Sequence, residues 1–394
     1  MSSQNQLPND FPANSVGTPS VAIDWYRAAP WWRAINPVLN ISWRASHILL
    51  CCLGLFLSYL CSATLLWVFQ PDLPSVSMHA AMQPRMLSVS PVGFSERFGA
   101  PTLLSVWAYF LAPVSVWLAQ PTLRVSAMSL AYVGCLIGIW GFIGGCLTRR
   151  TVVECGAQTT MPWMHTFQIV IKRLQSIAWS IAMPACALVF VMILPVLAGV
   201  MSRLPWIGFV IAFLLLIPIM LAVLAVAWVS AITLLGFPLS VCAIVTERKA
   251  DAFDGVSRSA AYVFQRPLVF ILLIAAFQFL SFAASEIFGS IMWVGKTLLA
   301  TAFDLSASHE MVAIQSILLD GIPTLLLGGF SISFFWSAAG SIYLILRREV
   351  DRTEYDHIDP ALTESAVPEA ANESATEIGS VASVPSSDAS TDVG

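Results

Sequence analysis

Charged residues are scarce in this sequence, and it has no cluster of positive charge. Asp, Glu, Lys and Arg make up 11% of the 394 residues, against about 25% in an average soluble domain. The net charge is −4, and 57% of the residues are hydrophobic, more apolar surface than a soluble domain could cover. The composition therefore excludes an ordinary soluble enzyme and a nucleic-acid-binding domain, and it predicts the lipid bilayer as the main partner.

Catalytic and metal-binding motifs are also missing. The sequence has no G-x-x-x-x-G-K-[ST], no H-E-x-x-H and no G-x-S-x-G, and its five His residues are scattered. None of the eight Cys residues belongs to a C-x-x-C pair, and most lie in or at the ends of apolar runs. We therefore expect no enzymatic activity, no metal and no cofactor, and we expect the cysteines to be small buried side chains.

Long apolar runs are what the sequence does have. Each of six runs reaches the ~20 residues that a helix needs to cross a bilayer, and none alternates apolar with polar residues as a membrane-spanning strand would. The sequence thus predicts an all-α, polytopic helical bundle with a transmembrane domain over 47–350. The six expected spans are 47–69, 125–147, 177–200, 207–235, 268–290 and 322–346.

A seventh apolar run, 102–119, is shorter and contains Pro113. With six spans, 14 of the 19 Lys and Arg residues fall in segments assigned to the inside and five in segments assigned to the outside. This bias is typical of cytoplasmic segments, and a seventh crossing would move one basic flank outside. We therefore expect 102–119 to lie flat on the outer interface or to dip in without crossing. Both termini are then cytoplasmic.

The segments that flank the spans differ in character. Residues 1–23 are polar, carry no Lys or Arg, and are predicted to be disordered and not a signal peptide. Residues 351–394 are rich in acidic and small residues and are predicted to be a disordered cytoplasmic tail. In 24–46, Trp and Arg alternate, which favours a cytoplasmic anchor at the membrane interface over a tucked loop. The residues concerned are Trp25, Arg27, Trp31, Trp32, Arg33, Trp43 and Arg44.

Two further stretches have helical apolar periodicity and are predicted to lie on the cytoplasmic membrane surface. In 163–178 the apolar face contains Trp163, Phe167, Val170, Ile171, Leu174 and Ala178. In 250–266 it contains Phe253, Val256, Ala260, Val263 and Phe264, and Pro267 begins the next span.

The loop after the fourth expected span contains a motif that resembles a known family. Pro238, Ala243-Ile244-Val245, Glu247, Ala252-Phe253 and Ser257-Arg258-Ser259 resemble the signature of the membrane domain attached to some bacterial glycerophosphodiester phosphodiesterases. Trp32, Arg33, Asn36, Pro37, Tyr343, Arg347 and Arg348 extend the resemblance over about 25–350. The resemblance implies a membrane domain of about six helices with no established activity, and the phosphodiesterase catalytic domain is absent.

Small residues mark two helix faces. Gly134, Gly138, Gly141 and Gly145 share one face of the second span, and Ser333, Ser337 and Ser341 share one face of the sixth. Small residues let helices approach closely in lipid. We predict that both faces pack against neighbouring helices; the alternative is that they line a substrate path.

Four charged residues are candidates for a functional role. Glu286 is the one acid inside an expected span, but it lies near the outward end, where an interfacial position is the simpler interpretation. Glu247, Asp254 and Arg258 could bind a partner or a lipid headgroup. We favour the simpler interpretation, in which Asp254 and Arg258 form an ordinary i,i+4 pair on a helix surface.

Two functions remain open. The first is a structural, assembly or interaction component that binds other membrane proteins or anionic lipids. The second is a transporter or channel-like subunit for a small or lipidic solute, which Pro184, Pro195 and Pro218 would favour by breaking spans three and four. The shortage of charge at mid-membrane disfavours the second.

Overall fold

The computed structural model describes residues 32–69, 103–119, 122–201, 203, 207–247, 250–306 and 317–355. These residues are helical almost throughout and contain no strand, which confirms the all-α prediction. Among these residues, six helices are long and apolar enough to cross a membrane, so this is a multi-pass membrane protein. They are α3 (Ala45–Phe69), α6 (Leu123–Gly156), α7 (Trp163–Met201), α9 (Leu216–Thr246), α11 (Pro267–Ser306) and α13 (Ile322–Asp351).

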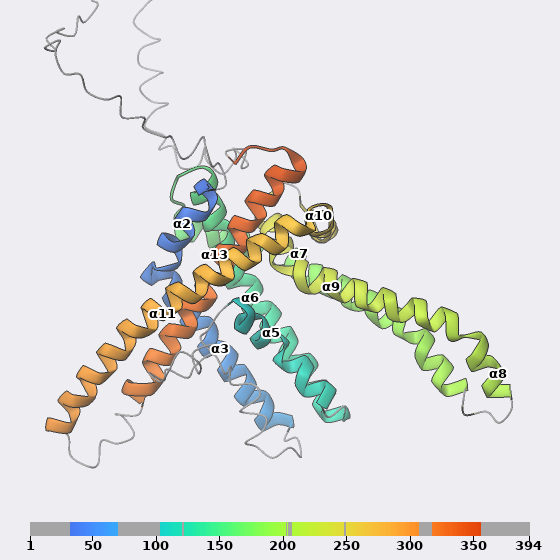
Figure 1. The fold of residues 1–394 in the computed structure, drawn as a ribbon. Helices are drawn as coiled ribbons and strands as arrows, with labels where there is room; N and C mark the ends of the chain where they lie inside the picture. The colour runs from blue at the N-terminus through green and yellow to red at the C-terminus, as the bar shows by residue number, and fades with distance from the viewer. Residues whose placement is uncertain are drawn as a thin grey trace, which may run out of the picture.

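Helix α13 is the centre of the molecule. Its most apolar window is 89% buried, and α2, α3, α5, α6, α9 and α11 all contact it. A short π-helical turn, η4 (Ile317–Gly321), precedes it. The other long helices meet near the C-terminal end of α13 and diverge from there, so that the bundle is closed at one end and splayed at the other (Figure 1).

Helix α2 (Trp32–Ser42) is the described part of the predicted interface segment, and it packs along α13 and α6. Ala34 and Val38 are fully buried in this contact. Trp43 lies edge-on to Phe288 at 5.5 Å and to Phe330 at 5.3 Å between ring centroids. Trp43 therefore packs against aromatic rings, whereas Trp32 is exposed, and an anchor at the membrane interface over 24–46 stays a prediction. Residues 24–31 lie outside the described residues.

Helix α5 (Leu103–Ala119) is packed among the other helices. Its Val106 is fully buried, and Trp107 lies 5.4 Å from Phe335 and Phe110 5.9 Å from Trp140 between ring centroids. A position flat on the outer interface is wrong, because these aromatic side chains reach α13 and α6. The packing agrees with the other alternative, a short helix that enters the bundle.

Helices α7, α8 (Ile207–Leu214) and α9 form an arm that leaves the body of the molecule (Figure 1). The predicted surface helix over 163–178 is in fact the first part of α7, which is continuous through Pro184 and Pro195. The predicted span over 207–235 is divided at Leu215 into α8 and α9. In α7 and α9 only 11% of the most apolar window is buried, so most of this arm faces outward.

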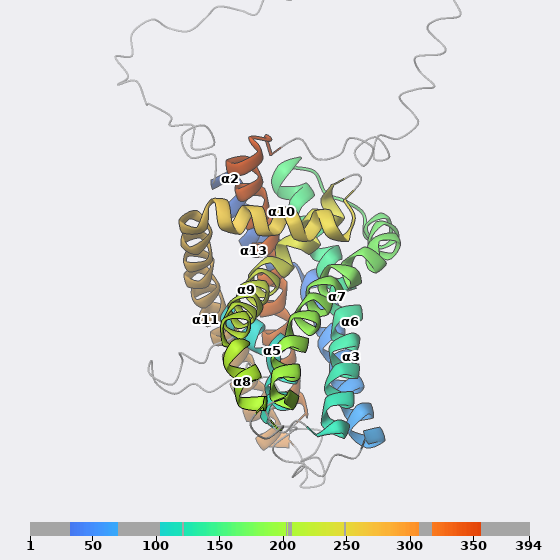
Figure 2. The ribbon, with the colours of Figure 1, turned by 90° about the vertical axis from the view of Figure 1, so that its right-hand side faces the viewer.

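Helix α10 (Ala252–Gln265) lies across the closed end (Figure 2). Asp251 caps it, because its side chain accepts a hydrogen bond from the backbone N–H of Asp254 at 2.8 Å. Its buried residues are the small Ala252, Gly255 and Ser259 together with Tyr262 and Val263, and a Cβ on Gly255 would lie 2.7 Å from Ile244. This close approach to α9 explains why a glycine stands there.

Only part of the apolar face predicted for 250–266 packs against other helices. Val263 is buried, but Phe253 is 66% exposed, and Phe264 stacks on Trp228 of α9 at 4.3 Å between ring centroids. The helix therefore rests on α9 through small residues, and its phenylalanines lie at the margins.

Candidate functional site

Nine charged side chains of the described residues are joined by ion pairs and hydrogen bonds at the closed end of the bundle, and we call this group the polar end. It joins the C-terminal ends of α6, α9 and α13 to α10 and to the start of α3 and α7. Its members are Arg44, Arg149, Arg150, Glu154, Arg173, Glu247, Arg258, Arg347 and Asp351.

Glu247 is the hub of the polar end. It follows α9 directly in extended conformation, and its carboxylate accepts a hydrogen bond from the Tyr343 hydroxyl at 2.9 Å. The same Oε1 lies 3.2 Å from Nε of Arg347 and 3.7 Å from Arg258. One carboxylate thus connects the ends of α9, α10 and α13. The predicted pair between Asp254 and Arg258 is wrong, because Arg258 pairs across helices with Glu247.

A tyrosine–carboxylate contact adds a second connection between α10 and α13. The Tyr262 hydroxyl donates a hydrogen bond to Asp351, and its ring lies 5.9 Å from that of Tyr343. Burial raises the pKa of Tyr262, and the hydrogen bond to Asp351 raises it further. Tyr262 therefore stays protonated and serves as a donor throughout the physiological pH range.

Two arginines cap the C-terminal end of α9 from neighbouring helices. Arg149 of α6 donates to the carbonyl of Val245, and Arg173 of α7 donates to the carbonyls of Ile244 and Glu247. The last carbonyls of a helix have no partner within the helix, and they carry partial negative charge. The guanidinium groups supply both the missing donors and the opposite charge. The buried Ile244-Val245 segment is thereby held by backbone contacts.

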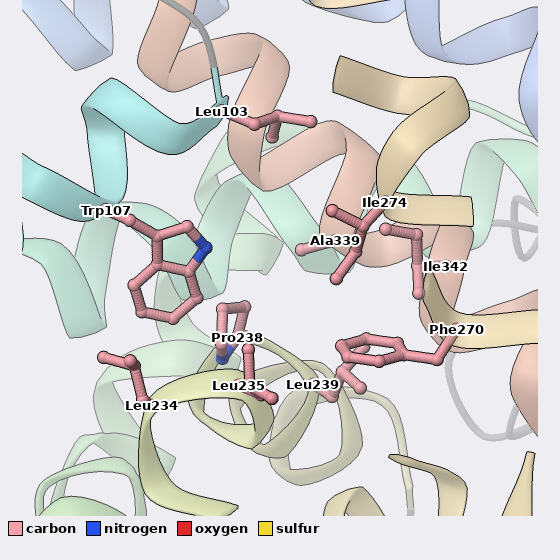
Figure 3. A pocket seen from close by; sticks show the side chains of 10 residues that line it. All are labelled: Leu103, Trp107, Leu234, Leu235, Pro238, Leu239, Phe270, Ile274, Ala339 and Ile342. Carbon is pink, nitrogen blue, oxygen red and sulfur yellow. The ribbon is translucent and has the colours of Figure 1, made fainter. Parts of the chain in front are cut away.

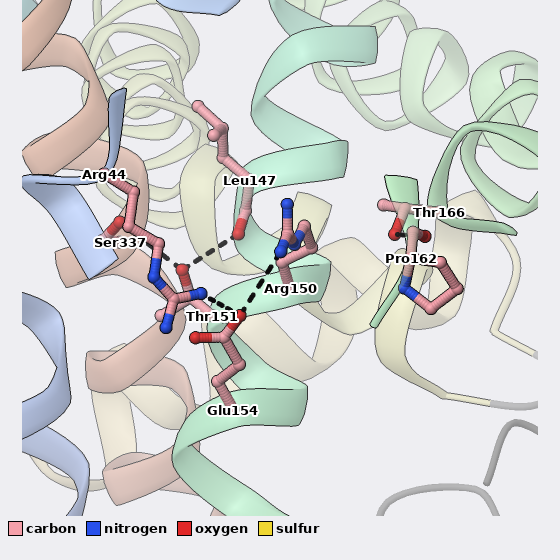
Figure 4. Close-up of polar contacts among 8 residues, drawn as sticks. All are labelled: Arg44, Leu147, Arg150, Thr151, Glu154, Pro162, Thr166 and Ser337. Carbon is pink, nitrogen blue, oxygen red and sulfur yellow. Dashed lines mark hydrogen bonds and ion pairs between the residues drawn. The ribbon is translucent and has the colours of Figure 1, made fainter. Parts of the chain in front are cut away.

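A second carboxylate, Glu154, organises the neighbouring side of the polar end (Figure 4). Arg44 lies 2.6 Å from it and Arg150 3.7 Å from it, so α6 is connected to the start of α3. The Arg150 guanidinium also lies over the Trp163 ring at 4.0 Å from its centroid. Both carboxylates are therefore engaged by arginines, an arrangement that fixes helix ends.

His47 is buried beside this cluster. Its ring lies edge-on to Trp163 at 5.2 Å between centroids. Neither ring nitrogen has a hydrogen-bond partner among the described residues. The side chain is fully inaccessible, so it fills space between α3 and α7.

Only two of the four glycines on the predicted face of α6 pack against a neighbouring helix. Gly141 and Gly145 are buried, and a Cβ on either would lie 3.0 Å from a side chain of α7, Ile177 or Val170. A Cβ on Gly134 or Gly138 would meet nothing within 4 Å among the described residues. The prediction is corrected for these two, because α7 diverges from α6 toward the splayed end.

The tightest glycine contacts were not among the predicted residues. A Cβ on Gly144 would overlap the indole of Trp336, and one on Gly329 would overlap Cys52 and approach the carbonyl of Ile48. Gly144 lies beside the predicted stripe, but the side chain that it faces, Trp336, comes from α13. Without the partner helix, the sequence does not distinguish these glycines from the open ones.

The serine face of α13 packs against α2 and α6. Ser341 donates to the carbonyl of Ala34 at 2.7 Å, and Ser333 donates to the carbonyl of Ser42 at 3.2 Å. Ser337 accepts from Thr151 at 3.4 Å. All three hydroxyls are buried between helices, so they stabilise helix contacts and do not line an open path.

Glu286 lies apart from the polar end. It is partly buried on α11, roughly 28 Å along the helix from Pro267 at a rise of 1.5 Å per residue. It has an interaction partner, but the structure does not bring it together with Glu247, Asp254 or Arg258. The four predicted charged candidates therefore do not form one site.

An apolar cavity of about 230 Å³ lies next to the polar end, and sequence patterns alone did not indicate it. Four helices line it, it is partly open at the surface, and its side chains converge on one space (Figure 3). They come from α5 (Leu103, Trp107), α9 (Leu234, Leu235, Pro238, Leu239), α11 (Phe270, Ile274) and α13 (Ala339, Ile342).

Comparisons with known proteins add no family to this description. No family model matches the chain, and no curated protein and no solved structure matches it. Among the residues that the structure describes, no group of three or more His, Cys, Asp or Glu is placed to hold a metal ion. The geometry therefore offers two features with functional potential: the arginine–carboxylate polar end and the apolar cavity.

Proposed function

We propose that this protein is a structural or assembly component of a bacterial cytoplasmic membrane, and that it binds other membrane proteins through the α7–α9 arm. The main support is the contrast in burial between the helices. The apolar window of α13 is 89% buried, but those of α7 and α9 are 11% buried. The body supplies a fixed base, and the arm presents two apolar helices outside it.

The polar end supports this role because it fixes the base of the arm. Arg149 and Arg173 hold the C-terminal end of α9, and Glu247 connects that end to α13. Helices in lipid associate by close packing, so a preset helix pair loses less freedom on binding than two independent helices. A fixed arm is thus suited to packing against transmembrane helices of a partner.

The charge distribution supports an orientation with the polar end in the cytoplasm. Arg44, Arg150, Arg173 and Arg347 lie at the polar end, and cytoplasmic segments carry an excess of such residues. The transporter alternative has less support. Of the prolines that favour it, Pro184 and Pro195 do not break α7, whereas the expected fourth span is divided at Leu215, next to Pro218 in the first turn of α9.

Site-specific photocrosslinking in native membranes tests the proposal. A photoreactive amino acid replaces Phe190 on α7 or Leu224 on α9, which are both more than 60% exposed. Phe330, which is fully buried, is the matched control. We expect the two arm positions to give the same protein adduct in repeated preparations and the control to give none. Recovery of lipid adducts alone at both arm positions would contradict a protein-binding arm.

A further inference from the structure

The apolar cavity lies at the level in the membrane where lipid acyl chains lie. Three of its four helices, α9, α11 and α13, are candidate membrane spans. Leu239 precedes Glu247 by two helical turns, about 12 Å at a rise of 1.5 Å per residue. The cavity therefore lies just below the charged layer, where the first part of an acyl chain lies in a bilayer.

The apolar lining of the cavity favours an apolar chain as its occupant. All ten lining residues are apolar, so the burial of hydrocarbon in this partly open space is favourable. An empty space deprives its lining of dispersion contacts, so a hydrocarbon occupant is favoured over a void. With about 230 Å³, the space is far too small for a helix, whose diameter with side chains is about 10 Å. A single extended chain segment fits it.

A basic residue, Arg266, lies one helical turn before the cavity residue Phe270. Arg266 is exposed, and the Phe270 N–H donates to the Arg266 carbonyl at 3.0 Å. Among the described residues, Arg266 has no ion-pair partner, whereas Arg258 and Arg347 both face Glu247. Guanidinium groups bind phosphate in bidentate geometry. A phosphate at this level would meet Arg266 at the start of α11.

We propose that the cavity binds one acyl chain of an anionic phospholipid whose headgroup phosphate is held by Arg266. The chain enters between α9 and α11, and its first methylenes contact Leu235, Phe270 and Ile274 (Figure 3). The bound lipid then fills the space between the arm and the body. This inference does not depend on a protein partner of the arm.

Photoreactive lipids test the proposal on the full chain. The purified protein is reconstituted in phosphatidylcholine vesicles that contain either phosphatidylglycerol or phosphatidylcholine with a diazirine in the acyl chain. After irradiation, adducts are mapped by peptide mass spectrometry. We expect adducts on the peptides that carry Leu235 and Phe270, with several-fold more from the anionic lipid than from the neutral one.

Four variants, one of them a control and one a substitute, separate the parts of the proposal. Ala339→Phe fills the cavity from α13 and should reduce cavity adducts several-fold, whereas Leu224→Phe on the exposed arm is the matched control and should not. Arg266→Gln should remove the preference for phosphatidylglycerol but leave chain adducts in place. If Ala339→Phe does not elute as a folded monomer, Leu235→Trp fills the same space from α9.

Two results would overturn the proposal. In one, lipid adducts are equally frequent at Leu224, at Leu272 and in the cavity, and neither Ala339→Phe nor Leu235→Trp changes their frequency. Lipid would then surround the helices generally and would not occupy a specific site. The other is a cavity crosslinked to a second copy of the chain and not to lipid. Equal labelling by both lipids before and after Arg266→Gln would contradict the headgroup site itself.

Discussion

At the scale of single residues, packing decides which of the small side chains matter. Four glycines of α6 share a face by spacing, yet only Gly141 and Gly145 meet α7. The sequence predicts the face because helical periodicity is local. It cannot predict what covers the face, because α7 diverges from α6 and Trp336 comes from a helix far along the chain.

The contrast between Gly144 and Gly138 gives a direct prediction. Gly144→Ala places a Cβ inside the Trp336 indole, so we expect a loss of about 1–3 kcal/mol, as is typical of overpacked interiors. Gly138→Ala adds a methyl group where nothing lies within 4 Å, and it should be neutral. Thermal unfolding in detergent, followed by the loss of monomer on size exclusion, measures both. Equal midpoints for the two variants would show that the Trp336 contact does not constrain α6.

At the scale of elements, apolar runs predict the helices better than they predict the helix ends. The expected second span ends at 147, but α6 continues to Gly156. Hydropathy falls at Arg149 and Arg150, whereas the helix persists because Val245 and Glu154 engage these side chains. Short elements were harder still: nothing in the sequence of α5 shows that its aromatic residues would reach α13.

The same competition between local and long-range contacts explains which carboxylate Arg258 pairs with. A spacing of four residues predicts a pair with Asp254, but Glu247 lies at the end of the helix on which α10 rests and is also bound by Tyr343 and Arg347. The more buried carboxylate, with several donors, attracts the arginine. The resemblance of this segment to the phosphodiesterase-associated membrane domain stays a prediction, because no comparison tests it.

Substitutions that remove the charge of Glu247 or of Asp254 should therefore differ in their effect on stability. Glu247→Ala leaves Arg347, whose side chain is 9% exposed, without its carboxylate, and we expect a loss of about 3 kcal/mol, the lower end for breaking a buried pair. Asp254→Asn changes an exposed side chain and should stay within about 0.5 kcal/mol of the parent. Thermal midpoints of the purified proteins at one pH and lipid content provide the measurement. If Asp254→Asn proved the more damaging change, the hub assigned to Glu247 would be wrong.

At the scale of the whole molecule, the charges of the described helices are divided between two ends. Arginines and carboxylates hold the closed end together, and the splayed end carries Arg124, Arg203 and Lys296, the last paired with Asp320. The sequence predicts this asymmetry, because Lys and Arg residues in the loops near the span ends determine how the protein is oriented in the membrane. It does not predict the splaying, which follows from cross-helix contacts concentrated at one end.

The asymmetry predicts which end faces the cytoplasm. Ser257 lies exposed on α10 at the polar end, and Thr301 lies exposed near the far end of α11, about 50 Å from Pro267 at the rise of an α-helix. That length exceeds the hydrocarbon core of ~30 Å, so the two positions should lie on opposite sides. In a cysteine-free version, Thr301→Cys should react with an impermeant maleimide in intact spheroplasts, and Ser257→Cys should react only after permeabilisation. The reverse pattern would invert the orientation and move the polar end out of the cytoplasm, while labelling of both in intact cells would show that α11 does not cross the membrane.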